Sequence, residues 1–465
     1  MARLVVLSNR VADLNQQTQT GGLAVGLADA IKSRGGLWFG WNGSIEAEPS
    51  DTPDVSGTET VKMASLSLSD REYKQYYTCF SNSFLWPLLH YRADLLRYHE
   101  ICFSCYRKVN ARFAASAADL LRSDDLVWVH DYHLIPLGRE LRERSCRQRI
   151  GFFLHTPFPP PDLFAVAPDG EWLARSMLAY DVVGFQTRAD AEHFIHYVTD
   201  LDDIDATSDG VRHAGRDIKV GAFPIGIDVD AVADMSRQTA DDELVEHVKP
   251  DVPEMKTIIG VDRLDYSKGL PDRMKAFQTL LETEPALRGA VTYLQIAPPS
   301  REDVPAYVDI REELERVAGS INGDWGEFNW TPIRYIHRNI PRETVAFLFR
   351  QSDVGFVAPL RDGMNLVAKE FVVAQNPDDP GVLVLSKFAG AAEDLVDAVI
   401  VNPFDPEATA RSLRDALFMP LDERQDRHAA LLARVRKRDN HAWLSAFLDA
   451  LSGPASADAT GPPPG

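Results

Sequence analysis

Short apolar runs alternate with amphipathic stretches along most of the chain, and this alternation limits the folds that it can adopt. In the first half, apolar runs of strand length occur at 4–8, 126–130, 149–155 and 181–186. Several of the stretches between them repeat apolar residues with the period of a helix that is buried on one side. Strands that are apolar throughout and separated by helices are usually parallel and covered on both faces. The sequence therefore predicts an α/β fold.

A second series of the same kind begins at residue 256 and continues to residue 386. Because 465 residues are more than one hydrophobic core usually supports, each series is expected to form its own doubly wound domain. A polar segment at about 228–251 separates the two series. We predict an N-terminal Rossmann-like domain at 1–235, a C-terminal Rossmann-like domain with terminal helices at 236–451, and a disordered tail at 452–465.

The acidic composition limits the partners that the chain can bind. The formal net charge is −20, whereas nucleic acids and anionic membranes require a basic face, so neither is expected. No apolar run reaches the roughly 18 residues of a membrane helix, and the first residues do not form a signal peptide. We expect a cytoplasmic protein in which cations that bind anionic substrates are gathered locally.

The cysteines give little indication of function. They are Cys79, Cys102, Cys105 and Cys146, too few for a disulfide framework in a chain of this length, and they are expected to be reduced. Cys102 and Cys105 form a C-x-x-C pair, but no second Cys or His pair follows at ligand spacing. A metal or redox site is therefore not predicted.

Polar residues follow the predicted strands of the first half, where ligands of open α/β sheets usually bind. Gly21 and Gly22 precede a helix whose N–H groups suit an anion, although a tight turn without a ligand is an equal alternative. They do not form G-x-G-x-x-G, which disfavours an NAD-dependent oxidoreductase. Asp131, in VHDYH, could bind sugar hydroxyls or cap the next helix, and its histidine neighbours lack the spacing of a metal site. His155 could contact a ligand or be structural.

The stretch VDRLDYSKGLPDR follows the first predicted strand of the second half. Arg263 offers a planar fork to a phosphate and Lys268 a compact charge, so the two together suit a departing diphosphate. A solvated turn of mixed charge is the alternative. Asp262 and Asp265 could orient the two cations, whereas Arg273 is assigned to the helix that follows.

The run DGMNLVAKE, after a later strand, predicts a glycine turn that leads into a helix. Free backbone N–H groups from Asn365 to Val367 would meet a phosphate. Glu370 lies about one turn further and could take both hydroxyls of a ribose. The alternatives are that Asp362 is a turn residue and that Lys369 and Glu370 form a solvated helix face.

Two further features suggest a second substrate. Arg10 and Arg301 follow strands of opposite halves and could bind a second phosphate, which indicates group transfer from an activated nucleotide to a phosphorylated acceptor. The aromatic stretch at 72–92 contains Tyr77 and Trp86, which could belong to the core, the usual place of aromatic residues, or line a sugar site.

Several motifs occur in order along the chain: LVVLSNR, TGGLAVGL, GGLWFGWNG, FSNSFLWPLLHYR, HDYHLIP, GFFLHTPFPPP, GVDRLDYSKGLP, PLRDGMNLVAKEF and VLSKFAGAAEDL. Together they resemble the trehalose-6-phosphate synthase family, retaining glycosyltransferases of GT-B architecture. The resemblance implies two Rossmann-like domains facing across a cleft. It also implies transfer of glucose from UDP-glucose to glucose 6-phosphate, giving α,α-trehalose 6-phosphate and UDP, without a metal or cofactor. A homo-oligomer is expected.

The resemblance also implies roles for individual residues. The acceptor, glucose 6-phosphate, would be held by Arg10, Tyr77, Trp86, Asp131 and Arg301. The donor, UDP-glucose, would be held by Gly21, Gly22, Arg263, Lys268, Ile340, Asp362, Asn365, Leu366, Val367, Ala368, Lys369 and Glu370. The residues expected to act in catalysis are Arg263, Lys268, His155 and Asp362.

Two positions qualify this expectation. Thr156 stands where related enzymes often carry an aliphatic residue, so Thr156 and Trp86 are expected to influence anomer selectivity. Ile340 lies in a variable loop near the base, so GDP-glucose or ADP-glucose is an alternative donor, and a non-catalytic sugar-phosphate-sensing homologue is another alternative. In the implied front-face reaction, the leaving diphosphate takes the acceptor's proton while Arg263 and Lys268 stabilise its charge.

Overall fold

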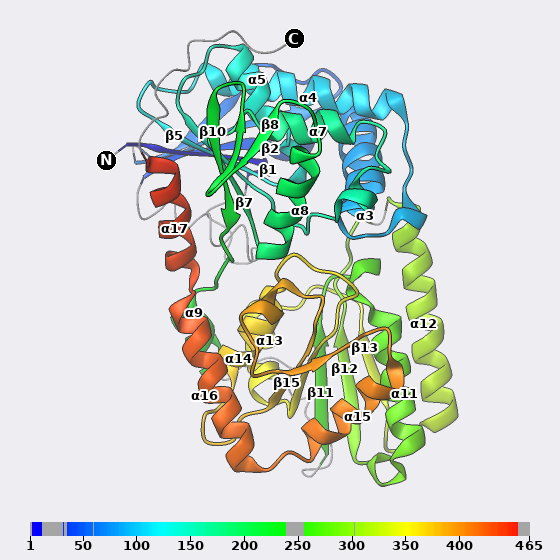
Figure 1. Cartoon of the computed structure of the whole chain (residues 1–465). Helices are drawn as coiled ribbons and strands as arrows, with labels where there is room; N and C mark the ends of the chain where they lie inside the picture. Colours follow the sequence, from blue (N-terminus) through cyan, green and yellow to red (C-terminus); the bar gives the residue numbers. More distant parts are fainter. Residues whose placement is uncertain are drawn as a thin grey trace. The chain divides into compact units, whose positions relative to one another are not determined.

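The chain folds into two compact α/β units. The structure, a computed structural model, describes residues 2–11, 31, 35–58, 60–238, 255–301 and 303–453. Unit 1 comprises residues 1–225 and 441–465, and unit 2 comprises residues 226–440 (Figure 1). Each unit has its own sheet with helices packed on it, which confirms the predicted fold class.

The sheet of unit 1 has the strand order β3-β4-β2-β1-β5-β6-β7-β10-β9-β8. The strands between β4 and β10 run parallel, as predicted. β3 pairs antiparallel with β4, and β8, β9 and β10 form antiparallel pairs at the other edge. The strands are β1 (Leu4–Arg10), β2 (Gly36–Ile45), β3 (Asp54–Gly57), β4 (Val61–Leu68), β5 (Leu126–His130), β6 (Arg149–Phe153), β7 (Val182–Phe185), β8 (Ile204–Thr207), β9 (Gly210–His213) and β10 (Arg216–Ala222).

The helices of unit 1 include a thirteen-residue π-helix, η1 (Tyr73–Leu85), which continues directly into α3 (Trp86–Leu89). A π-helix of this length is rare, and such segments are frequent at functional sites. The other helical segments of this unit are α2 (Asp70–Glu72), η2 (Ala93–Leu95), α4 (Glu100–Ala118), η3 (Tyr132–Leu134), α5 (Leu137–Glu143), α6 (Pro161–Phe164), α7 (Gly170–Met177), α8 (Arg188–Thr199) and α17 (Asn440–Ser452).

The sheet of unit 2 is parallel throughout, with the strand order β13-β12-β11-β14-β15-β16. Its strands are β11 (Lys256–Val261), β12 (Val291–Ile296), β13 (Ile333–Ile336), β14 (Val354–Val357), β15 (Val382–Ser386) and β16 (Val399–Val401). Its helical segments are α9 (Val229–Arg237), η4 (Tyr266–Lys268), α11 (Leu270–Thr283), η5 (Pro285–Leu287), α12 (Pro305–Trp325), α13 (Arg342–Arg350), α14 (Leu366–Ala374), η6 (Gly390–Glu393), α15 (Pro406–Leu417) and α16 (Leu421–Lys437). One apolar core joins β11, β12 and β14 to α11, α12 and α15.

The division into units differs from the predicted boundaries at both ends. Unit 2 begins at Gly226 rather than at 236, and α17 belongs to unit 1 instead of the second domain. The reason is packing: the Phe447 ring of α17 stacks on Trp128 of β5, with ring centroids 4.6 Å apart. A Cβ atom at Gly151 of β6 would lie 2.7 Å from that ring, so glycine allows α17 to approach the sheet. The predicted tail at 452–465 lies almost wholly outside the described residues.

The expectation of four reduced cysteines is wrong for two of them. Cys79 of η1 and Cys102 of α4 form a disulfide, while Cys105 is free and buried and Cys146 is free and partly exposed. The composition could not indicate this pairing, because it depends on the packing of η1 on α4.

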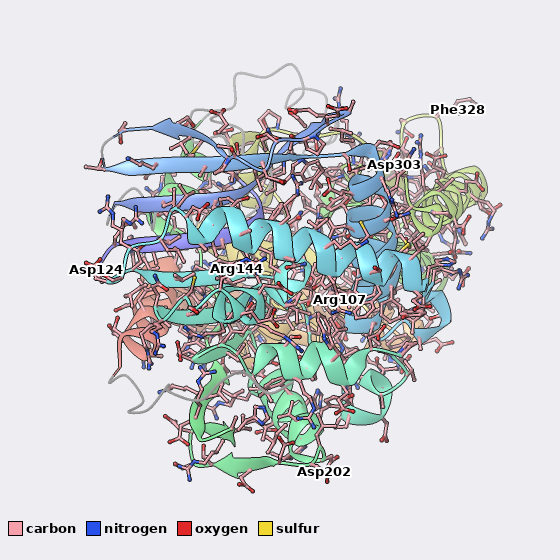
Figure 2. All side chains as sticks on the ribbon, turned by 90° about the horizontal axis from the view of Figure 1, so that it is seen from above. Arg107, Asp124, Arg144, Asp202, Asp303 and Phe328 are labelled. Carbon is pink, nitrogen blue, oxygen red and sulfur yellow. A yellow bond between two sulfur atoms is a disulfide. The ribbon has the colours of Figure 1, made fainter. Side chains whose placement is uncertain are left out.

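The surface agrees with the acidic composition. Acidic side chains such as Asp124 and Asp202 are exposed and lie at the edge of unit 1 in the view of Figure 2. None of the helices in the described ranges has the length and apolarity that crossing a bilayer requires. Among the described side chains, no three His, Cys, Asp or Glu residues gather in a way that could hold a metal ion.

Candidate active site

The strand order of unit 2 places the predicted donor residues side by side. β11 and β14 are adjacent in the sheet although they are distant in sequence. The chain leaves β11 towards β12 on one side of this pair and leaves β14 towards β15 on the other side. Such a switch point is where open α/β sheets usually bind ligands. Arg263 follows β11 and is exposed, and the loop after β14 carries Asp362 and Asn365.

Lys268 is held at the end of η4 by a tight turn. Gly269, with a φ of 63°, begins α11 in the left-handed conformation that glycine adopts without strain. A Cβ atom there would also lie 3.0 Å from the Ala358 carbonyl oxygen. The backbone N–H groups of Leu360 and Arg361 donate to the Ser267 carbonyl, so the two loops are joined directly.

The structure brings Lys268, Asp362 and Asn365 into one hydrogen-bonded group. The Lys268 ammonium lies 2.5 Å from Asp362 Oδ2, and the Asn365 side-chain amide donates to the same oxygen at 2.9 Å. Both members of the ion pair are only about a tenth exposed. Lys268 is thus a largely desolvated cation whose position is fixed by its counter-ion.

The start of α14 supplies free backbone donors. Asn365 caps the helix by accepting a hydrogen bond from the Ala368 N–H group, and its φ of 71° is uncommon for a residue other than glycine. Leu366 and Val367 begin α14 and are partly exposed, so their backbone N–H groups stand at the N-terminus of a helix.

The two charged residues of α14 differ in environment. Glu370 is half-buried and pairs with Arg342 at 3.3 Å. Burial raises the pKa of Glu370, and the Arg342 guanidinium opposes this shift. The Lys369 side chain is buried 3.7 Å from Asp394, and burial, together with the charge of Arg438, lowers the pKa of Lys369 to about 7. The alternative of a solvated helix face is therefore wrong.

Arg301 belongs to the same end of unit 2. It follows β12, has a φ of 49°, and lies 3.4 Å from Asp265. Asp265 is fully buried, accepts a hydrogen bond from the Ser267 N–H group and another from the Tyr307 hydroxyl. Asp265 therefore pairs with Arg301, whereas the sequence had suggested that it orients Arg263 and Lys268. Ile340 is half-buried between β13 and α13.

Unit 1 has a corresponding switch point between β1 and β5. The Arg10 guanidinium at the end of β1 lies over the Trp41 ring, 5.7 Å from its centroid. Tyr77 of η1 packs on the same tryptophan, with centroids 5.6 Å apart, and stacks on His133 at 5.7 Å. Arg10 and Tyr77 therefore meet on Trp41, a residue that the sequence prediction did not assign to the site although it lies in the GGLWFGWNG motif.

Asp131, at the end of β5, has a strained backbone with a φ of 75° and a ψ of 165°. Residues other than glycine rarely adopt this conformation, and it occurs most often at functional sites. The carboxylate accepts a hydrogen bond from the His155 N–H group at 3.3 Å, which connects the ends of β5 and β6.

The two histidines at these strand ends form a hydrogen-bonded pair. The Gln186 side-chain amide donates to His155 Nδ1 at 3.3 Å, so His155 Nε2 carries the proton and donates to His130 Nδ1 at 3.0 Å. Burial lowers the pKa of His155 to about 3. Burial also lowers the pKa of His130, and the neighbouring His155 adds to this lowering. Both imidazoles are thus neutral near pH 7.

Trp86 and Thr156 are mostly buried. Trp86 is 6% exposed, and its ring packs on His90 and Tyr132 with centroid distances of 4.0 and 5.6 Å. The Thr156 hydroxyl is buried and has no hydrogen-bond partner within the described ranges. Gly21 and Gly22 lie outside the described residues.

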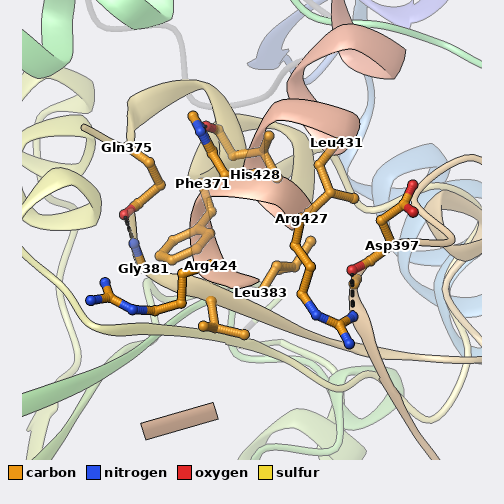
Figure 3. A pocket seen from close by; sticks show the side chains of 12 residues that line it. Phe371, Gln375, Gly381, Leu383, Asp397, Arg424, Arg427, His428 and Leu431 are labelled. Carbon is orange, nitrogen blue, oxygen red and sulfur yellow. Dashed lines mark hydrogen bonds between the residues drawn. The ribbon is translucent and has the colours of Figure 1, made fainter. Parts of the chain in front are cut away.

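A cavity elsewhere in unit 2 does not belong to this site. Figure 3 shows it between α14 and α16, lined by Phe371, Leu383 and Leu431, with Arg427 donating to the Asp397 carbonyl. Its volume of about 10 Å³ is at most that of one water probe. It is a packing gap rather than a ligand site.

Two α/β units, each with charged and polar side chains at the switch point of its sheet, have the architecture expected of a nucleotide-sugar-dependent glycosyltransferase. The chain matches the model of glycosyltransferase family 20 over residues 4–453 and belongs to that family.

Individual relatives agree with this assignment. A trehalose-6-phosphate synthase from Cronobacter sakazakii is 46% identical over 450 residues, covering 96% of this chain and 94% of the relative. The structure of a UDP-forming α,α-trehalose-phosphate synthase from Burkholderia xenovorans, in complex with glucose-6-phosphate, has a TM-score of 0.92 and 46% identity and covers 97% of this chain and 100% of that one. A structure from E. coli bound with UDP-2-fluoro glucose has a TM-score of 0.93 and 43% identity, covering 98% and 100%.

Proposed function

We propose that this chain is a retaining glycosyltransferase that transfers glucose from UDP-glucose to glucose 6-phosphate and forms α,α-trehalose 6-phosphate and UDP. The family match over residues 4–453 carries this proposal. It is supported by relatives of the same length that bind glucose-6-phosphate or a UDP-glucose analogue. A cytoplasmic location and a homo-oligomeric state are part of the same proposal.

The proposed donor residues are held by unit 2. Arg263 and Lys268 would bind the diphosphate, together with the backbone N–H groups at the start of α14. Glu370 would accept the ribose hydroxyls, and Arg342, its partner at 3.3 Å, would keep the carboxylate ionised. Asp362 holds Lys268 in place, which gives it an indirect part in catalysis.

The proposed acceptor residues use several kinds of contact. Arg10 and Arg301 would bind the phosphate of glucose 6-phosphate, with the Tyr77 hydroxyl as a further donor. Asp131 would accept hydrogen bonds from sugar hydroxyls. Trp86, being 6% exposed, would act mainly by fixing the wall of the sugar site.

The chemistry requires no protein base in this proposal. The bond between C1 of the donor glucose and the diphosphate oxygen breaks, and C1 bonds to the acceptor hydroxyl oxygen on the same face. The acceptor's proton moves to the departing diphosphate oxygen, whose charge Arg263 and Lys268 stabilise. His155 is neutral and its ring nitrogens are engaged, so it would support the loop at the donor sugar rather than transfer a proton.

The donor nucleotide can be tested with purified protein. UDP-, GDP- and ADP-glucose are each incubated with and without glucose 6-phosphate, and nucleotide release is followed. We expect release from UDP-glucose that depends on the acceptor and is at least tenfold faster than from the other two. Preference for GDP- or ADP-glucose would refute the choice of base, and no acceptor-dependent release with any donor would refute the transferase.

A further inference from the structure

A buried ion pair lies directly behind the donor residues of unit 2. Arg273 of α11 and Asp262, which follows β11, are 2.7 Å apart and 1% and 2% exposed at their side chains. Arg273 also donates to the Phe356 carbonyl of β14 at 3.1 Å. The sequence assigned Arg273 only to its helix, but the structure places it in contact with the carboxyl ends of β11 and β14.

A chain of hydrogen bonds leads from this pair to Lys268. The Asn365 side-chain amide donates to Asp262 Oδ1 at 3.3 Å and to Asp362 Oδ2 at 2.9 Å. Asp362 Oδ2 in turn accepts from the Lys268 ammonium at 2.5 Å. The Asn365 side-chain oxygen, Oδ1, accepts from the Ala368 backbone N–H group. The two hydrogens and the oxygen of this amide are therefore all engaged, which fixes its orientation.

The charges explain why the pair is needed. Asn365 connects two carboxylates, and an uncompensated carboxylate at Asp262, which is 5% exposed, would be costly. The Arg273 guanidinium compensates it at Oδ2, the oxygen other than the one that accepts from Asn365, so Asp362 remains available to Lys268. A displacement of about 1 Å in a catalytic group can lower a rate roughly a hundredfold.

We propose that Asp262 and Arg273 are positioning residues for glucosyl transfer. Asp262, neutralised by Arg273, fixes the Asn365 amide, and this amide fixes the Asp362–Lys268 pair that meets the diphosphate. The predicted effect on kcat rests on the proposed function. The predicted effect on UDP binding can be measured without turnover.

The experiment compares double variants, because removing one partner alone leaves a buried charge that can unfold the protein. Asp262→Ala/Arg273→Met removes both charges and the acceptor for Asn365. Asp262→Asn/Arg273→Met removes both charges but keeps an oxygen that can accept from Asn365. The matched control, Arg3→Met/Asp125→Asn, removes a largely buried ion pair of unit 1 that is 2.6 Å long.

Three quantities are measured at a temperature where every variant is folded: the Kd for UDP by calorimetry, kcat, and KM for glucose 6-phosphate. We expect the Ala/Met variant to bind UDP about tenfold more weakly and to lose about tenfold in kcat, the usual order for a misplaced transition-state donor, with KM for glucose 6-phosphate unchanged. The Kd for UDP and the kcat of the Asn/Met variant should both lie within about threefold of the wild-type values.

A purely structural role predicts a different result. The Ala/Met variant would then keep the UDP affinity and kcat of the control, and this result would overturn the proposal. If the Ala/Met variant does not fold, Asp262→Ser/Arg273→Met replaces it, because the serine hydroxyl is too short to reach Asn365. A wild type that binds UDP but releases none from UDP-glucose would refute the proposed function, while the UDP affinities would still test the positioning role.

Discussion

The position of each charged side chain at the strand ends depends mainly on its burial and on one specific partner. Asp362 with Lys268 and Asp265 with Arg301 are pairs of residues that the sequence had singled out separately. The sequence could identify these residues because charged side chains and glycines after apolar strands are unusual. It could not identify Arg273 or Arg342, because each stands in an ordinary amphipathic helix and gains its role from a distant carboxylate.

The neutral histidine pair makes stability depend on pH. Burial lowers the pKa of His155 to about 3 and lowers that of His130, whereas histidines of an unfolded chain titrate near 6.5. Below about pH 6.5 the unfolded state binds more protons, so the free energy of unfolding should fall as the pH decreases from 6.5 towards 3. His130→Gln should reduce this dependence, whereas His441→Gln, which changes an exposed histidine, should not.

Urea unfolding at pH 7.5 and pH 5.0 checks this expectation. The wild type and His441→Gln should lose more stability between the two pH values than His130→Gln does. Equal losses in all three proteins would show that the histidine pair is not protonated on unfolding in this range.

At the level of elements, the apolar strands of both sheets were predictable and the edge strands were not. β5, for example, has the predicted bounds because LVWVH is apolar up to its final histidine and is buried after Leu126. β8 and β9 escaped notice because they are short and pair antiparallel at an edge, where polar residues are tolerated. The π-helix η1 has no recognisable sequence signal, yet it places Tyr77 against Trp41 and Cys79 against α4.

The disulfide gives a prediction for this element. Cys79 and Cys102 are 23 positions apart, and closing a loop of this length should stabilise the fold by about 3 kcal/mol through the entropy of the unfolded chain. Dithiothreitol or Cys79→Ser/Cys102→Ser should therefore lower Tm, whereas Cys146→Ser should leave it unchanged. If the untreated protein already has four titratable thiols and its Tm does not respond to dithiothreitol, the disulfide does not form in solution.

On the scale of the whole molecule, the sequence predicted two α/β units but misplaced their boundary. The terminal helix α17 returns to unit 1 because Phe447 fits over Gly151 and Gly184, residues about 300 and 260 positions earlier in the chain. Periodicity shows that such a segment is helical, but it does not show which sheet the helix covers. The substrates were predicted from the family resemblance. Neither the strand order of the sheets nor the composition of the strands indicates which substrates bind.

The proposed reaction transfers glucose with retention to the anomeric hydroxyl of glucose 6-phosphate. The most direct measurement is an NMR spectrum of the product formed from UDP-glucose labelled with ¹³C in its glucose. We expect a phosphorylated disaccharide in which both anomeric centres are α and joined 1→1, with UDP released in equal amount. A β-configured labelled centre, a linkage to another hydroxyl, or free glucose as the sole product would contradict it.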